Sequence, residues 1–219
     1  MPAKYLNNSR KNLPARHLSS SIIMVLLSLL LAATGLLFLR LRNGVQIRPS
    51  QDQDILPVTE IICYRQDDAR WGKDMLGNSN YTLSSSGCLV SCIASALSME
   101  RGMEETPGTL NQKFSSEQIY DAEGNLLWEN LRKLGSYQVD VYPEVSSDLI
   151  DSCLSAGRYP IIRVRNHILG SFHYVLILGV CDGDYLCMDP LQDETVPLSS
   201  YGRRVYGIRC VSDITAPKS

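Results

Sequence analysis

The sequence lacks the features that mark several functional classes. Basic and acidic residues are balanced, with 21 Lys and Arg against 23 Asp and Glu, and both signs are mixed along the chain. No basic stripe for nucleic acid is therefore indicated. No glycine-rich phosphate loop is present, because Gly72-Lys73 lacks both the upstream glycine and the hydroxyl residue that would follow. We therefore expect no ATP-binding domain in this chain.

Histidine is scarce, and cysteine lacks the spacing of a zinc site. The seven cysteines are Cys63, Cys88, Cys92, Cys153, Cys181, Cys187 and Cys210, and no C-x-x-C pair occurs among them. This spacing disfavours structural zinc, so neither a metal nor a cofactor is expected. The odd total leaves at least one thiol free. Cys181 and Cys187 flank a predicted turn and are placed to approach each other.

One long apolar run lies near the N-terminus. Residues 18–39 carry no charge, and a helix of that length spans about 33 Å, which is enough to cross a hydrocarbon core of about 30 Å. We expect a basic tail over 1–17 and a single transmembrane signal anchor over 18–39. The alternative is a cleaved signal peptide, with "LAAT" as its cleavage region. The basic tail favours a cytoplasmic N-terminus, which would place the rest of the chain outside the cytoplasm.

The remaining sequence predicts a polar linker over 40–56 and one domain over 57–213. A short strand is expected at 58–64, followed by a long loop over 65–87. Helices are expected at 88–99, 106–114, 125–135 and 146–157, with a strand at 137–142. Four β-like runs close the domain, at 159–165, 172–180, 184–189 and 203–210. Because helices come first and strands last, the order predicts an α+β fold with an antiparallel sheet.

Cys88 lies at the start of the first of these helices, in "SSSGCLVSCIASALSM". A thiolate there would face unpaired backbone N–H groups and the positive end of the helix dipole. That environment lowers a thiol pKa and favours a nucleophile. The other interpretation is a small buried cysteine, which fits Cys92 one turn later.

A thiol nucleophile needs a base, and the base needs an acceptor that orients it. His173 begins the apolar strand "HYVLILGV", whereas His167 fits an exposed loop. Asp189 ends the following strand and is the candidate acceptor. A symmetric hairpin around Gly183 would set Asp189 opposite residues near Ile177, so contact with His173 requires strong twist, a bulge or a curved strand.

Acyl transfer also needs a donor for the developing oxyanion. Gln66 has a side-chain amide and could act together with the backbone N–H of Cys88. The competing interpretation is that Gln66 is one polar loop residue among many, and spacing alone does not choose between them.

Five pieces of the chain, in this order, resemble one family: "YRQDDARWGKDMLG", "SSSGCLVSCIASALSM", "TPGTLNQKF", "HYVLILGV" and "GDYLCMDP". The chain is similar to papain-like cysteine peptidases related to the bacteriocin-processing, double-glycine leader peptidases, in particular to their stand-alone members. The resemblance implies a papain-like α+β fold with Gln66 as oxyanion donor, Cys88 as nucleophile, His173 as base and Asp189 as the orienting residue. Leader-cleaving members are fused to an ATP-driven transporter. Because this chain has no phosphate loop, leader processing coupled to export does not follow.

Three functions remain in view. The first is a membrane-anchored cysteine peptidase that hydrolyses a peptide or amide bond in a peptide or protein substrate. The second is an inactive module of the same fold that binds peptides or a partner at the cell surface. The third is a metal site formed by Cys88, Cys92 and His173, for which no fourth ligand is evident. The peptidase is favoured because every catalytic role has a candidate residue.

Overall fold

The structure is a computed structural model that describes residues 20–42, 44–50, 54–55, 60–167 and 170–214. The chain divides into two compact units, residues 1–42 and 43–219, and each is described by itself. The first unit contains helix α1 (Ser20–Leu41). Its stretch Ser20–Leu39 has a mean hydropathy of 2.8 and is long and apolar enough to cross a membrane. The predicted basic tail over 1–17 lies outside the described residues.

Part of the predicted linker packs on the second unit. Strand β1 (Val45–Gln46) pairs with β7 (Arg204–Val205), and Ile47 beside it is buried. Ile55 pairs with Val180. Burial of the apolar residue Ile47 favours this docking, so the folded unit begins before residue 57, where the sequence predicted its start.

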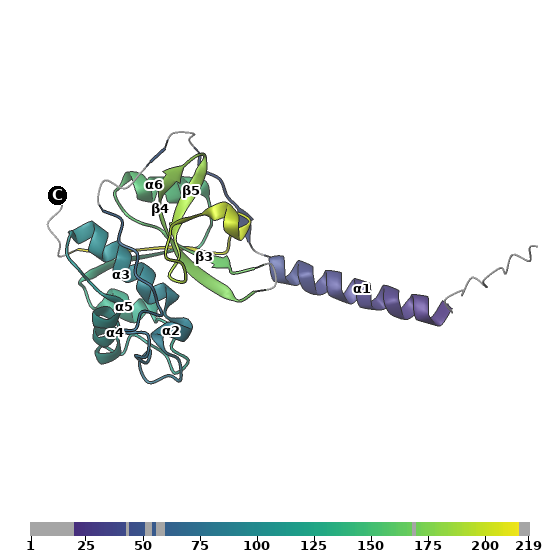
Figure 1. Cartoon of the computed structure of the whole chain (residues 1–219), viewed down its shortest axis with the longest axis horizontal. Helices are drawn as coiled ribbons and strands as arrows, with labels where there is room; N and C mark the ends of the chain where they lie inside the picture. Colours follow the sequence, from purple (N-terminus) through teal and green to yellow (C-terminus); the bar gives the residue numbers. More distant parts are fainter. Residues whose placement is uncertain (1–19, 43, 51–53, 56–59, 168–169, 215–219) are drawn as a thin grey trace, which may run out of the picture. The chain divides into compact units, whose positions relative to one another are not determined.

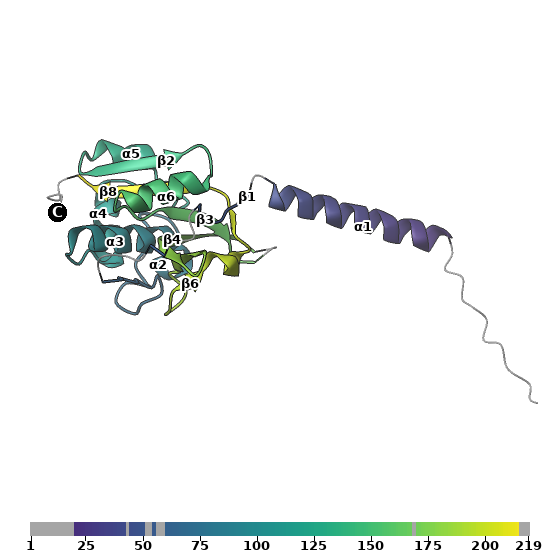
Figure 2. The ribbon, with the colours of Figure 1, turned by 90° about the horizontal axis from the view of Figure 1, so that it is seen from above.

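A six-stranded antiparallel sheet organises the second unit, in the order β2-β8-β3-β4-β5-β6. Figure 2 labels β2, β8, β3, β4 and β6 in this order from top to bottom. The strands are β2 (Tyr137–Tyr142), β3 (Ile161–Arg165), β4 (Phe172–Cys181), β5 (Asp184–Met188), β6 (Val196–Pro197) and β8 (Ile208–Asp213). The predicted α+β class with an antiparallel sheet is confirmed.

The strand predicted at 203–210 is wrong as a single element, because that run divides into β7 and β8. Between them, Tyr206 N donates to the carbonyl of Arg163, and Arg163 N donates to the carbonyl of Gly207. After pairing with β1 through β7, the chain therefore begins to pair with β3 within a few residues. The strand predicted at 58–64 is also wrong in its described part, 60–64, where Tyr64 N donates to Ser95 Oγ instead of to a neighbouring strand.

Four helices of this unit lie where the sequence predicts them, and a fifth, α2, falls within the predicted loop over 65–87. They are α2 (Leu83–Ser86), α3 (Cys88–Arg101), α4 (Pro107–Ser116), α5 (Trp128–Lys133) and α6 (Ser147–Ser155), with the 3-10 helix η1 (Leu198–Tyr201). Thr106 and Ser146 cap α4 and α6 through their side-chain oxygens. Helix α5 is shorter than predicted, because Leu126 pairs with Tyr120 and the helix begins after Leu127.

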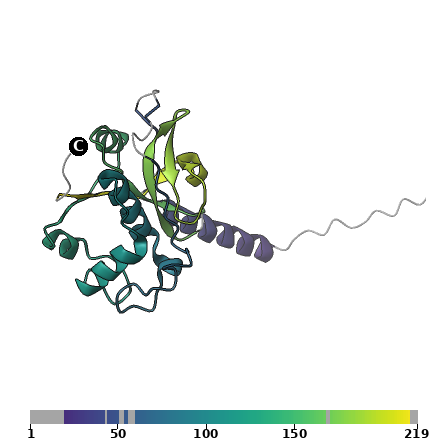
Figure 3. The same cartoon turned by 60° about the vertical axis from the view of Figure 1, so that its left-hand side comes forward.

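The sheet separates two apolar cores. On one face, α3 packs across β3, β4 and β8, and its residues Ile93 and Leu97 join Leu176 and Val211. In the second core, Ile150 of α6 packs with residues from the other face of the sheet, among them Ile162, Val175 and Ile177. Figure 1 shows α2 to α5 gathered on one side of β3, β4 and β5, and Figure 3 shows the same division after a turn.

One extra residue, Leu178, changes the register between β4 and β5. Ile177 lies opposite Cys187, but Gly179 already lies opposite Leu186, so Leu178 has no partner. This is a β-bulge, which shifts every later side chain of the pair by one position. The predicted hairpin is therefore present, but it is not symmetric along its whole length.

The predicted approach of Cys181 to Cys187 is wrong. Cys181 pairs with Asp184 beside the turn, whereas Cys187 lies opposite Ile177 and is buried. All seven cysteines are free thiols in this structure. The two cysteines are separated because they belong to different residue pairs of the same hairpin, Cys181 with Asp184 and Cys187 with Ile177.

We expect Leu97→Ala to lower the free energy of unfolding by about 3 kcal/mol, because Leu97 is fully buried in the core under α3. Urea denaturation of the segment that begins at residue 43 measures this loss. The matched control is Leu127→Ala, since that side chain is 38% exposed, and we expect it to cost under about 1 kcal/mol. Equal losses in the two variants would contradict the position of the core.

Candidate active site

The junction between α2 and α3 determines where Cys88 lies. Thr82 and Ser85 form a capping box at the start of α2, and Gly87 N then donates to Leu83 O over 2.7 Å. A Cβ on Gly87 would lie only 2.5 Å from that oxygen, so this tight turn requires glycine. Cys88 follows as the first residue of α3, and no side chain caps the helix there. Its backbone N–H groups therefore remain available to a ligand.

Gln66 is held beside this junction by two hydrogen bonds. Its backbone N–H donates to Pro190 O over 3.0 Å, and its Nε2 donates to Ser84 O over 2.7 Å. The side chain is buried, and a primary amide has a second N–H to donate. The predicted loop over 65–87 is thus ordered around Gln66 and links the helix junction to the residues that follow β5.

His173 and Asp189 form a buried pair. His173 Nε2 lies 2.6 Å from Asp189 Oδ1, and both residues are at most 5% exposed. Asp189 Oδ1 also accepts from Leu191 N over 2.8 Å, while its Oδ2 accepts a short hydrogen bond from Tyr201. Because Asp189 uses Nε2, the ring presents Nδ1 to any further partner.

The bulge at Leu178 puts these two side chains on one face of the strand pair. Without the extra residue, Asp189 would lie opposite Leu176, whose side chain points to the other face from His173. With the bulge, Met188 lies opposite Leu176, so Asp189 comes opposite Val175, two residues from His173. Residues two apart on a strand share a face, and diagonal neighbours in an antiparallel pair are within side-chain reach.

The electrostatics of the pair favour an imidazolium beside a carboxylate. Burial opposes the charge on His173, but the hydrogen bonds and charges of Asp189 and Cys88 outweigh it and raise its pKa to about 9. Burial also opposes the charge on Asp189, yet the pKa of that carboxyl is lowered by His173 and Tyr201. Cys88 therefore interacts with the same ring that Asp189 orients.

Three of the four predicted residues line one cleft of about 620 Å³, namely Gln66, Cys88 and His173. Asp189 lies behind His173. Apolar and aromatic side chains make up much of the remaining wall, including Leu76, Leu89, Tyr120, Trp128, Phe172 and Tyr174. The cleft is therefore large enough to receive several residues of an extended peptide beside the thiol.

Two arginines stack on aromatic side chains that line this cleft, and one of them, Arg163, lines the cleft itself. The guanidinium of Arg163 lies 4.3 Å from the ring centre of Phe172, and that of Arg209 lies 5.4 Å from the ring centre of Tyr174. Burial and the charge of Arg163 lower the pKa of Arg209. Among the described residues, no carboxylate lies within salt-bridge distance of either arginine. Arg163 therefore brings to the cleft a positive charge that has no ion-pair partner among the described residues.

Sequence reasoning missed Tyr201 and Ser84. Tyr201 comes from η1 and donates to Asp189, and Ser84 supplies the carbonyl that fixes Gln66. Neither contact has a local signal, because each joins residues 12 or more positions apart. The one local signal is Gly202, which directly follows Tyr201 and ends η1 with a positive φ. A glycine at this position indicates an ordered turn, but it does not indicate the contact with Asp189.

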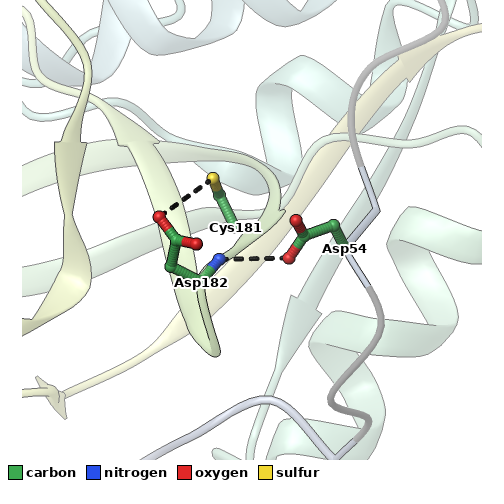
Figure 4. Close-up of side chains that lie close together, drawn as sticks. All are labelled: Asp54, Cys181 and Asp182. Atoms are coloured by element: carbon green, nitrogen blue, oxygen red, sulfur yellow. Dashed lines mark hydrogen bonds between the residues drawn. The ribbon is translucent and has the colours of Figure 1, made fainter.

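Metal-binding groups do not gather at this cleft. Among the described residues, three such side chains come within 4.8 Å of one another only at Asp54, Cys181 and Asp182. Figure 4 shows this group, in which Asp182 N donates to Asp54 Oδ1 over 3.0 Å and Cys181 Sγ lies 3.8 Å from Asp182 Oδ2. The group is mostly exposed. The ligand atoms of the alternative trio, Cys88, Cys92 and His173, do not come within that distance of one another, and Cys92 Sγ donates instead to Tyr174 O.

Comparison with known proteins leaves the family open. No protein-family model matches the chain, and no curated protein matches it.

We expect His173→Gln to remove a pH-dependent part of the stability. The pKa of His173 rises on folding from 6.5 to about 9, so its contribution is fully present below pH 6.5 and is lost as the pH rises through 9. Urea denaturation of both proteins across this range measures the difference in unfolding free energy, which should shrink with increasing pH. His167→Gln, at an exposed position, is the matched control. A difference between wild type and His173→Gln that stays constant over the range would contradict the charged pair.

Proposed function

We propose that this chain is a membrane-anchored cysteine peptidase of the papain-like class, which hydrolyses a peptide or amide bond. The observation that carries the proposal is the convergence of Cys88, His173 and Gln66 on one cleft, with Asp189 bonded to the far nitrogen of His173. These residues come from separate parts of the chain, and each has the chemistry that one catalytic role needs.

The reaction would begin with a thiolate on Cys88 beside an imidazolium on His173. Sγ attacks the carbonyl carbon of the substrate, and the developing oxyanion accepts hydrogen bonds from the backbone N–H of Cys88 and the second N–H of Gln66 Nε2. His173 gives the Nδ1 proton to the leaving amine, which departs and leaves a thioester on Cys88. His173 then takes a proton from water, which attacks the thioester and releases the acid.

Asp189 and its neighbours would orient the base. The bond to Nε2 fixes the ring so that Nδ1 faces Cys88, and the carboxylate stabilises the imidazolium. Tyr201 and Leu191 hold the carboxylate in turn. The backbone N–H of Gln66 donates to the carbonyl of Pro190, the residue after Asp189. The same segment after β5 therefore positions both the base His173 and the oxyanion donor Gln66.

Anchoring of this unit at a membrane is supported by α1, whose apolar stretch is long enough to span the hydrocarbon core. The basic tail before it favours a cytoplasmic N-terminus and a peptidase unit on the other side of the membrane. The substrate would then be an extracytoplasmic peptide or protein.

The charge of the cleft favours a substrate with an acidic residue near the bond that is cleaved. Arg163 lines the cleft and has a buried Nε without a hydrogen-bond partner among the described residues. A carboxylate of the substrate would supply the missing counter-charge to this guanidinium.

Cleavage of a mixed peptide library by the full chain in detergent tests the proposed activity. Mass spectrometry should detect new peptide termini with the wild type and none with Cys88→Ala. Gln66→Ala should lower the rate by roughly 100- to 1,000-fold, as the loss of one oxyanion donor does elsewhere. Gln138→Ala, at an exposed position on β2, is the matched control. Cleavage retained by Cys88→Ala, or equal rates in both glutamine variants, would overturn the proposal.

The same library tests whether Arg163 makes the cleft prefer acidic peptides. Peptides with Asp or Glu near the cleaved bond should be preferred, and Arg163→Gln should reduce that preference by roughly 10-fold, the effect of one charge-assisted hydrogen bond. Arg70→Gln removes an equal charge from an exposed side chain outside the cleft and should change nothing. If Arg163→Gln cleaves acidic and neutral peptides in the wild-type ratio, Arg163 does not determine the preference for acidic substrates.

A further inference from the structure

Two buried sulfur atoms meet where α6 packs against the sheet. Cys153 in α6 and Cys210 in β8 are 57 residues apart in the sequence, yet their Sγ atoms lie 3.0 Å apart. Both side chains are buried. A disulfide bond is about 2.05 Å long, so the two sulfurs need to approach by only about 1 Å to be joined.

This pair differs from the other cysteines of the domain. Among the described residues no other two cysteine sulfurs are hydrogen-bonded to each other: Cys92 Sγ contacts the carbonyl of Tyr174, and Cys187 Sγ contacts that of Tyr185. Cys88 interacts with His173 instead. The seven cysteines therefore resolve into one adjacent pair and five separate thiols.

The surroundings of Cys153 favour its thiolate. The pKa of Cys153 is lowered, and the largest cause is the hydrogen bond that Cys210 donates to it. Burial raises this pKa, whereas the Tyr142 hydroxyl and the charge of Arg158 lower it further. The Tyr142 hydroxyl lies 3.5 Å from Cys153 Sγ. Since the thiolate is the attacking species in disulfide exchange, a neighbouring thiol that donates to it favours the joining of these two sulfurs.

We propose that Cys153 and Cys210 form a disulfide when the domain folds in the presence of a disulfide oxidant such as oxidised glutathione. The Cys153 thiolate attacks one sulfur of the oxidant, which forms a mixed disulfide and releases one thiol. Cys210 then attacks Cys153 Sγ, which forms the internal bond and releases the second thiol. The two electrons and the two thiol protons of the protein leave with the reduced oxidant.

The bond would enclose the part of the chain that holds the base and its acceptor. The segment between the two cysteines contains β3, β4 and β5, and with them His173 and Asp189, whereas Cys88 lies outside it. It would also fasten α6 to β8, which pairs with β3. Constraining this segment in the unfolded chain stabilises the folded sheet, because fewer unfolded conformations remain.

The test uses the full chain, reduced, unfolded and then refolded in detergent with a mixture of reduced and oxidised glutathione. Intact mass should fall by two hydrogens per chain, and a digest without reductant should contain one linked peptide pair that joins Cys153 to Cys210. Reduction should lower the melting temperature by roughly 10 °C. In Cys210→Ser, reductant should no longer change the melting temperature.

Cys187→Ala is the matched control, because it removes a buried thiol of β5 whose hydrogen bond is to the carbonyl of Tyr185 and not to another cysteine. It should form the bond and respond to reductant as the wild type does. The proposal is overturned if the refolded wild type leaves Cys153 and Cys210 open to alkylation after unfolding, or if either of them is linked to a different cysteine. The mapping uses wild-type protein, so it decides the question even where a serine variant does not fold.

Discussion

The hydrogen bond between His173 and Asp189 depends on one extra residue in β4. Leu178 has no partner on β5, and the bulge that it creates turns Asp189 to the face on which His173 lies. A hairpin without the bulge would point the two side chains to opposite faces of the sheet. The same strand end holds Pro190, whose carbonyl binds Gln66. A single irregularity in the sheet thus places the base, its acceptor and the candidate oxyanion donor relative to one another.

The second constraint is the tight junction before Cys88. Gly87 is required because the carbonyl of Leu83 occupies the space that a Cβ would need. The thiol is consequently fixed at the first turn of a helix whose other face is buried in the core. The rigid core supports the helix, and the sheet supports His173, so the cleft lies between two parts that pack on each other. Such support is what precise alignment of a nucleophile and its base needs.

Sequence patterns were sufficient for elements with strong local signals. The helices expected at 88–99, 106–114 and 146–157 are present, because capping by Thr106 and Ser146 and amphipathic burial act within a few residues. The alternation in β2 and the order of helices and strands predicted the sheet class. The strand predicted near Tyr64 was wrong since its backbone bonds to a side chain of α3. Strong twist, a bulge or a curved strand would each bring His173 and Asp189 into contact. The residue pattern of the strand did not show which of the three occurs. The contacts of Tyr201 and Ser84 depend on the tertiary fold and have no local pattern.

The most direct measurement of the central claim is the rate at which iodoacetamide alkylates Cys88 as a function of pH, followed by peptide mapping, in the wild type and in His173→Ala. If Cys88 and His173 form a thiolate–imidazolium pair, Cys88 reacts well below the ordinary thiol value of about 8.5, and the His173→Ala variant loses this reactivity at low pH. If Cys88 is inert, or follows the profile of an ordinary thiol in both proteins, the pair does not exist and the peptidase account is contradicted.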